Sequence, residues 1–133
     1  MYFQLIDYSD YFYRMVRRGV IPTGRGGKFV QLNYDDTEFV VMSPMEFSRY
    51  HANIVERFCM GRQLSGYYND KRDKYYTIDT SLEIMGGGMW KVDDELSTLH
   101  LCGTSRAYGD YDDTGLREKV SSVLTGYSVI LGK

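Results

Sequence analysis

Short stretches of the chain alternate between hydrophobic and polar residues, and this pattern predicts strands. The clearest are KFVQLNY at Lys28–Tyr34 and STLHLC at Ser97–Cys102. The pair Asp35 and Asp36 supplies a turn, so the first of these stretches should form a hairpin with the next apolar one. The other expected strands are Glu38–Met42, Lys74–Thr80, Ser81–Met85 and Tyr127–Leu131. The sequence therefore predicts about six strands.

After this hairpin, apolar residues recur at helical spacing, and this spacing predicts one long amphipathic helix from Ser43 to Gly61. Ser43 can cap the first turn, Pro44 suits the first helical position, and Glu46 completes a capping box. Gly61 is a natural stop for the helix. At about 100° per residue, one side of this helix is apolar. That side carries Phe47, Tyr50, His51, Ile54, Val55 and Phe58.

His51 lies in the middle of that apolar side. A buried imidazole must find hydrogen-bond partners or stand at the rim of a cavity, because burying an unpaired polar group is costly. The simplest interpretation is a core histidine that a backbone carbonyl satisfies. The alternative is an acid–base group, since histidine titrates near neutral pH. The helix alone leaves both interpretations open.

Two further helices are predicted. One is Thr114–Leu124, where apolar residues recur at helical spacing, and the other is a short helix through Tyr11–Arg18 that Gly19 ends. Together with the strands, these helices predict an α/β fold of the α+β type. We expect a mixed sheet of about six strands flanked by two main helices, in a single domain. Residues 1–26 are expected to form an N-terminal extension with a glycine-rich loop, and residues 27–133 the main domain.

The composition is that of one compact globular domain, with 133 residues of which 43% are hydrophobic and 26% charged. The net charge of −2 predicts no general attraction to nucleic acid or to anionic membranes. The opening MYFQLIDYSD lacks the basic and then apolar run of a secretory signal. No apolar run approaches the roughly 20 residues that span a bilayer. We therefore expect a cytoplasmic protein that does not associate with membranes.

Two glycine-rich stretches invite comparison with ligand-binding loops. The stretch TGRGGK at 23–28 is no Walker motif, because Pro22 stands where glycine is required and Phe29 where Ser or Thr binds magnesium. It supports only a flexible loop that ends in Lys28. The run Gly86–Gly88 costs folding entropy, so its backbone should need unusual dihedral angles or a close approach to another group.

Three separated segments resemble one family, the phosphohistidine phosphatases of the janus/ocnus type. They are YHANI at 50–54, GGG at 86–88 and HLCGTSRAYG at 100–109. These are similar to the family's Y-H-A-D-I, G-G-G-R and I-H-V-x-G-x-S-x-A-Y-G, in the same order and at similar spacing. The resemblance covers roughly Gly27 to Leu131. It implies a small mixed sheet between two helices, and metal-free removal of phosphate from phosphohistidine in proteins.

The resemblance also implies roles for residues of this chain. His51 matches the catalytic histidine, which would act as general base or as phosphoryl acceptor. The backbone N–H groups of residues 104–107 would cradle the phosphate, Lys28 would supply a point charge, and Arg106 could add a guanidinium. The substrate-binding residues implied in this way are Lys28, Tyr50, Gly103, Thr104, Ser105, Arg106 and Ala107.

Four positions depart from the family pattern. Met89 stands where an arginine usually follows the three glycines, and Ser43 aligns with another family arginine. Asn53 replaces an aspartate, and Arg106 replaces an uncharged residue. These departures leave an alternative open: a weakened or inactive member of the family that binds a phosphorylated or acidic partner. A further alternative is a subunit of a larger assembly that uses the tyrosine-rich first 20 residues as a docking arm.

The expected substrates are a phosphohistidine-containing protein or a small phosphoramidate. We expect no cofactor, and we expect no metal because His51 and His100 lack metal-ligand spacing and no carboxylate cluster joins them. His100 alternates in phase with its strand and is expected to be structural. Nucleic acid is not expected as a partner. A protein partner could dock on the tyrosine-rich, basic first 20 residues.

Overall fold

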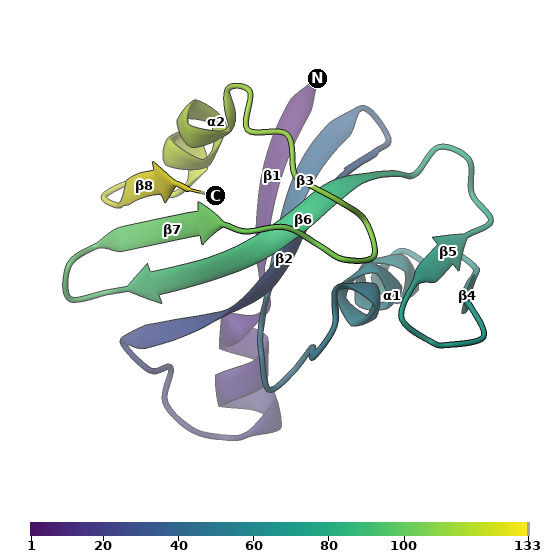
Figure 1. Cartoon of the computed structure of the whole chain (residues 1–133). Helices are drawn as coiled ribbons and strands as arrows, with labels where there is room; N and C mark the ends of the chain where they lie inside the picture. Colours follow the sequence, from purple (N-terminus) through teal and green to yellow (C-terminus); the bar gives the residue numbers. More distant parts are fainter. Residues whose placement is uncertain (133) are drawn as a thin grey trace.

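A computed structural model describes residues 1–132 and shows a six-stranded sheet with one main helix on each face (Figure 1). The strands of this sheet are β1 (Tyr2–Asp7), β2 (Gly24–Tyr34), β3 (Thr37–Pro44), β6 (Glu83–Asp93), β7 (Thr98–Cys102) and β8 (Ser128–Leu131). A separate ribbon consists of β4 (Gly66–Tyr68) and β5 (Tyr75–Thr77). The helical elements are the π-helix η1 (Tyr11–Val16), α1 (His51–Gly61) and α2 (Leu116–Val123).

The main sheet is mixed, with the strand order β1-β3-β2-β6-β7-β8. β1 runs parallel to β3 and β7 runs parallel to β8, whereas the other neighbours are antiparallel. The prediction of an α+β fold with a mixed six-stranded sheet and two main helices is therefore confirmed. Within residues 1–132, no helix is both long enough and apolar enough to cross a bilayer.

Each face of the sheet has its own hydrophobic core, because successive residues of a strand point to opposite faces. Val30 and Val41 point to the face that α1 covers, where Phe58 of α1 packs on them. Phe29 and Met42, their neighbours along the chain, point to the face that α2 covers. The face to which a candidate residue points therefore decides whether it lies near α1 or near α2.

The long helix begins later than the sequence pattern predicts. Ser43 and Pro44 form the end of β3 and pair with β2, and α1 begins only at His51. The hydroxyl of Ser43 is buried and donates to Ser48 (2.7 Å), and its carbonyl accepts from Trp90 Nε1 (3.0 Å). The predicted cap was a local signal, and the pairing of this segment with β2 overrides it.

The first 26 residues are built into the fold. β1 forms one edge of the main sheet, an element that the sequence analysis missed, and η1 takes the place of the predicted helix at 11–18. Phe12 packs against Phe47, with 5.1 Å between ring centroids. The Tyr13 hydroxyl donates to Glu46 (2.8 Å), so this glutamate caps no helix. The N-terminal segment thus supports the residues that lead into α1.

Both glycine-rich stretches belong to strands. Residues 24–28 of the expected flexible loop lie in β2, and the run Gly86–Gly88 lies inside β6. β4 lies in a stretch expected to be loop. The last three elements, β7, α2 and β8, agree with their predicted ranges to within two residues. In the long β2–β6 pairing, Gly86–Gly88 lie opposite Phe29–Gln31, and Lys28 lies opposite Met89.

Candidate active site

His51 is tied to the sheet through one ring nitrogen. It is the first residue of α1 and only 7% exposed, and its Nε2 lies 3.0 Å from the carbonyl oxygen of Gly88 in β6. A carbonyl can only accept a hydrogen bond, so Nε2 carries the proton. One of the two interpretations left open by the sequence, a histidine satisfied by a backbone carbonyl, is therefore correct for this nitrogen.

The other ring nitrogen of His51, Nδ1, then holds the lone pair. No residue among 1–132 forms a hydrogen bond with Nδ1. Nδ1 is also absent from the described side-chain atoms that are both buried and unpartnered. It is therefore accessible. A neutral imidazole nitrogen that is accessible and held in a fixed orientation can accept a proton or attack an electrophile.

His51 and Ser105 of the turn at 104–109 come together at Gly87. A methyl group on Gly87 would lie 2.9 Å from Cδ2 of His51 and 3.2 Å from Cβ of Ser105. Both side chains thus approach the same point on β6, and only a glycine leaves room for them. The sequence analysis expected a close approach at the triple glycine, and this expectation is confirmed.

The turn that contains Ser105 is closed on itself and leans on β6. Ser105 N–H donates to the Gly109 carbonyl (3.1 Å), and Gly109 N–H donates to the Ser105 carbonyl (2.7 Å). The Gly109 carbonyl also accepts from Gly87 N–H (3.1 Å). Inside the turn, Tyr108 N–H donates to Ser105 Oγ (3.1 Å). These bonds fix the turn beside the histidine.

Tyr108 anchors the same turn at its far side. Its hydroxyl accepts from Tyr75 N–H (2.9 Å) and donates to the Tyr75 carbonyl (2.8 Å). Burial raises the pKa of the Tyr108 hydroxyl, so it stays protonated and keeps both bonds. Figure 1 shows the segment after β7 swinging toward α1 before it returns to α2. The turn is thus held from β6 and from β5.

Several N–H groups around His51 are free to bind an anion. Within residues 1–132, those of Thr104, Arg106 and Ala107 find no acceptor, and neither do the first two of α1. The N–H of Ser105 is used inside the turn. The Thr104 hydroxyl donates to Asp110 and leaves the backbone N–H of Thr104 free. Unpaired N–H groups at a turn and at a helix start are typical anion-binding features.

Lys28 and Tyr50 lie on the rim of this site. Lys28 is on the same face of β2 as Val30, its Nζ donates to the carbonyl of Arg49 (2.8 Å), and it lies 5.6 Å from the ring centroid of Tyr50. Tyr50 directly precedes His51 and is 48% exposed. The sequence placed both residues near the histidine, and the structure brings them there.

The surroundings of His51 keep its ring neutral. Burial lowers the pKa of His51 below its ordinary value, and the positive charge of Lys28 lowers it further. The hydrogen bond to the Gly88 carbonyl raises this pKa, but its effect is smaller than that of burial. A lowered pKa means that Nδ1 keeps its lone pair at neutral pH.

The two positions that lack a family arginine differ in their placement. Met89 lies opposite Lys28 and Cys102 in the sheet, on the face that carries His51. A methyl group on Gly103 would lie 3.5 Å from Cγ of Met89, so this side chain borders the turn. Ser43 is fully buried and cannot reach an anion at the surface. Of these two departures, only the one at Met89 removes a charge from the site.

Arg106 remains available as a replacement cation. Its side chain is exposed, and it forms no ion pair or hydrogen bond with any other residue among 1–132. His100 is exposed on β7 rather than packed in a core. In the described part of the chain, no three or more His, Cys, Asp and Glu side chains gather as a metal site would require.

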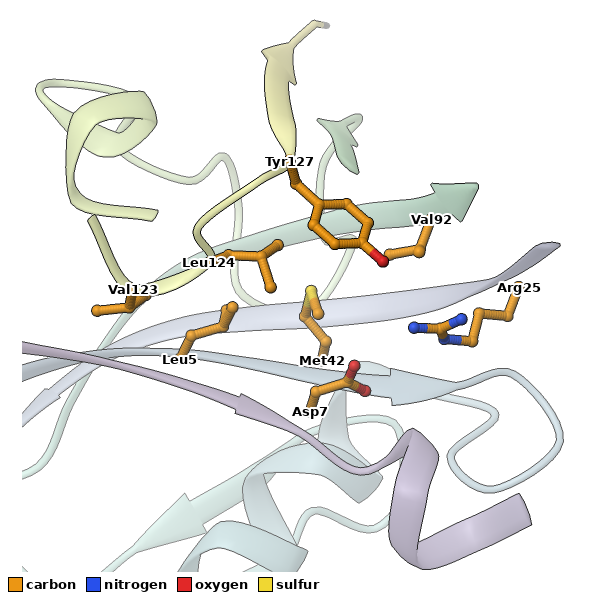
Figure 2. A pocket seen from close by; sticks show the side chains of 8 residues that line it. All are labelled: Leu5, Asp7, Arg25, Met42, Val92, Val123, Leu124 and Tyr127. Carbon is orange, nitrogen blue, oxygen red and sulfur yellow. The ribbon is translucent and has the colours of Figure 1, made fainter. Parts of the chain in front are cut away.

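A hollow of about 270 Å³ lies on the other face of the sheet, away from His51 (Figure 2). Arg25 and Tyr127 point into it, but both also bind Asp94: Arg25 Nη1 lies 2.6 Å from this carboxylate, and the Tyr127 hydroxyl donates to it. These polar groups therefore tie β2 and the residue that precedes β8 to the β6–β7 connection. The hollow is separate from the candidate site.

Sequence reasoning missed the groups that hold the site in place. No residue type in the sequence indicates that the Gly88 carbonyl binds His51 or that Tyr108 binds the backbone of Tyr75. The run of glycines was the available signal for the first, since it marked a close approach. The pairing of Tyr108 with Tyr75 depends on how the β4–β5 ribbon folds back, which no local pattern reports.

Comparison with known families agrees with this arrangement. A family model described as Janus/Ocnus family (Ocnus) matches residues 28–128, which include His51, the triple glycine and the turn at 104–109. A search of curated proteins gave no match. The match covers most of the chain, and it begins at Lys28, after β1 and η1. The chain belongs to the Janus/Ocnus family.

Proposed function

We propose that this protein hydrolyses the P–N bond of phosphohistidine, without a metal ion, in a phosphorylated protein or a small phosphoramidate. The observation that carries the proposal is the accessible Nδ1 of His51, whose orientation is fixed by the Nε2 bond to Gly88. A base for this reaction must be neutral at working pH and must be aimed, and Nδ1 meets both conditions.

The phosphoryl group would bind between His51 and the turn. The free N–H groups of Arg106 and Ala107 would donate to its equatorial oxygens, and the N–H groups at the start of α1 would face it from the other side. Lys28 and the guanidinium of Arg106 would neutralise the remaining charge. Such prepositioned donors stabilise developing charge without reorganisation.

Water would then attack phosphorus opposite the departing imidazole. Nδ1 of His51 accepts a proton from this water as the new O–P bond forms and the P–N bond breaks. The leaving imidazole takes a proton from solvent and departs as a neutral group, and the imidazolium of His51 returns its proton to solvent. The sum consumes one water and yields phosphate and the unphosphorylated substrate, with His51 neutral again.

A second function is favoured by Met89, which places a thioether opposite Lys28 where the family pattern has a guanidinium. A site that keeps its N–H donors but has lost one cation could bind a phosphorylated partner without turning it over. Both functions predict binding, and only the first predicts release of phosphate.

The test is release of inorganic phosphate from chemically phosphorylated polyhistidine in the presence of EDTA. We expect the wild-type protein to release phosphate and the His51→Ala variant to match the rate without protein. Binding of phosphorylated polyhistidine by the wild type with no release above that background would select the binding function instead.

A further inference from the structure

The sheet face that carries His51 is covered over only part of its width. α1 packs on β2 and β3, while the same face continues across β6, β7 and β8. The register of the strands defines two rows of side chains beyond the histidine. The nearer row holds Lys28, Met89 and Cys102, and the farther row holds Gly26, Lys91, His100 and Ile130.

The side chains of the farther row are more exposed to solvent than those of the nearer row. Lys91 and His100 are exposed, and Ile130 is 40% exposed. Met89 and Cys102 in the nearer row are partly buried. The face thus offers apolar and basic groups together, next to the candidate active site.

The charge of this face differs from that of the chain. The chain carries a net charge of −2, yet the two rows contain Lys28 and Lys91 and no acidic residue. The nearest acid along β6 on this face is Asp93, one row farther, and its carboxylate accepts the N–H groups of Glu95 and Leu96. A basic patch on an acidic protein attracts an acidic partner selectively.

We propose that this face docks an extended acidic segment of the phosphorylated protein, with its phosphohistidine at His51 and an acidic side chain on Lys91. An aliphatic side chain of the same segment would lie on Ile130. The proposal rests on the proposed function and specifies its substrate class. A protein segment fits better than a nucleic acid, because the two rows hold no Phe, Tyr or Trp on which bases could stack.

The distance along β6 from the point of contact with His51 to Lys91 predicts the position of the acidic residue in the substrate. Gly87 contacts His51, and Lys91 lies four residues farther along β6. At roughly 3.4 Å per residue this is on the order of 14 Å, which an extended peptide also spans in about four residues. The preferred substrate should therefore carry a glutamate or aspartate about four residues from the phosphohistidine.

The experiment uses fluorescent nine-residue phosphohistidine peptides that differ only in having glutamate or glutamine four residues on either side. Their dissociation constants are measured by fluorescence anisotropy in the His51→Ala background, where no turnover interferes. The test variant adds Lys91→Glu, and the matched control adds Arg117→Glu, an equal change of charge on the exposed surface of α2. Hydrolysis of phosphoramidate by the single variants Lys91→Glu and Arg117→Glu checks that the catalytic site is intact.

We expect tighter binding of the glutamate peptide by about fivefold, loss of that preference in Lys91→Glu, and its retention in Arg117→Glu. Hydrolysis of phosphoramidate by Lys91→Glu should equal that of the wild type. An equal loss of preference in both variants, or an unchanged preference in Lys91→Glu, overturns the docking proposal. Tighter binding of a single-stranded oligonucleotide than of the glutamate peptide overturns it as well. If the wild type does not hydrolyse phosphoramidate, the proposed function is refuted. The docking proposal is then still tested by the peptide binding measurements.

Discussion

Nε2 of His51 and the carbonyl oxygen of Gly88 lie 3.0 Å apart, joining the first residue of α1 to the third glycine of β6. This bond places the ring proton on Nε2 and leaves Nδ1 as the reactive atom. A buried histidine can therefore be satisfied by a hydrogen bond at Nε2 while Nδ1 stays free for the proposed chemistry. The carbonyl-satisfied interpretation holds for Nε2, and Nδ1 is the atom that we propose as the base.

Replacing His51 separates its structural bond from its chemistry. His51→Ala leaves the Gly88 carbonyl without its donor, which should lower the free energy of unfolding by about 1–3 kcal/mol. His51→Gln keeps an amide donor and should lose less stability. Both variants should lose activity by at least about 100-fold, because neither has a base at Nδ1. Urea denaturation and phosphate release are the measurements, and an active His51→Gln protein would exclude the imidazole as base.

The pH dependence of activity should follow the lowered pKa of His51. Protonation of Nδ1 abolishes the base, so the acid limb of kcat/KM should lie below the ordinary histidine value of about 6.5. Lys28→Gln removes a positive charge that lowers this pKa, so the acid limb should move to higher pH. Arg117→Gln, on the other face, should leave the limb in place. A limb that does not move in Lys28→Gln would show that another group titrates.

The same pKa contributes to stability with a definite sign. The folded state holds His51 with a pKa below its unfolded value, so protonation favours the unfolded chain. This contribution to stability is present above about pH 6.5 and is lost as the pH falls toward the folded pKa. The His51→Gln variant should lack this part of the pH dependence of unfolding.

Gly87 should tolerate no side chain, unlike a glycine in open space. A methyl group there would lie 2.6 Å from the Phe29 carbonyl oxygen as well as against His51, so Gly87→Ala should destabilise the fold by about 1–3 kcal/mol and reduce activity. The control is Gly61→Ala at the end of α1, where nothing lies within 4 Å. That change should stabilise by roughly 0.5–1 kcal/mol, since alanine is the better helix former. Equal stability of the two variants would contradict the packing described at β6.

Met89→Arg tests whether the missing cation limits the site. A guanidinium opposite Lys28 would add a partner for phosphoryl oxygens, and we expect kcat/KM for phosphohistidine to rise about fivefold. Met89→Gln, of similar length without the charge, serves as control. If both variants behave alike, the charge at this position has no part in binding.

The strands and α2 were predictable because their signals are local. Ser97–Cys102 alternates along a strand that is buried on one face, and Leu116 and Val120 recur at helical spacing. The start of α1 was not predictable in the same way. Ser43, Pro44 and Glu46 imitate a helix start, and only the pairing of Ser43 and Pro44 with β2 reveals that a strand ends there.

The candidate site was predictable as a set of residues but not as a geometry. The motifs named His51 and the turn at 104–109, and the structure brings both to Gly87. Which nitrogen faces outward depends on the Gly88 carbonyl, and this carbonyl is placed by the register of β6 on β2. Register is a property of the whole sheet, so no motif could report it.

The central claim is that one imidazole nitrogen and the amides of the turn bind the same phosphate. It is tested most directly by titrating inorganic phosphate into ¹⁵N-labelled protein and following Nδ1 of His51 with the amides of Arg106 and Ala107. The account predicts that all three signals shift together along one binding curve, and that Lys28→Gln weakens all three equally. Amides that respond while Nδ1 does not, or that follow a different curve, would contradict it.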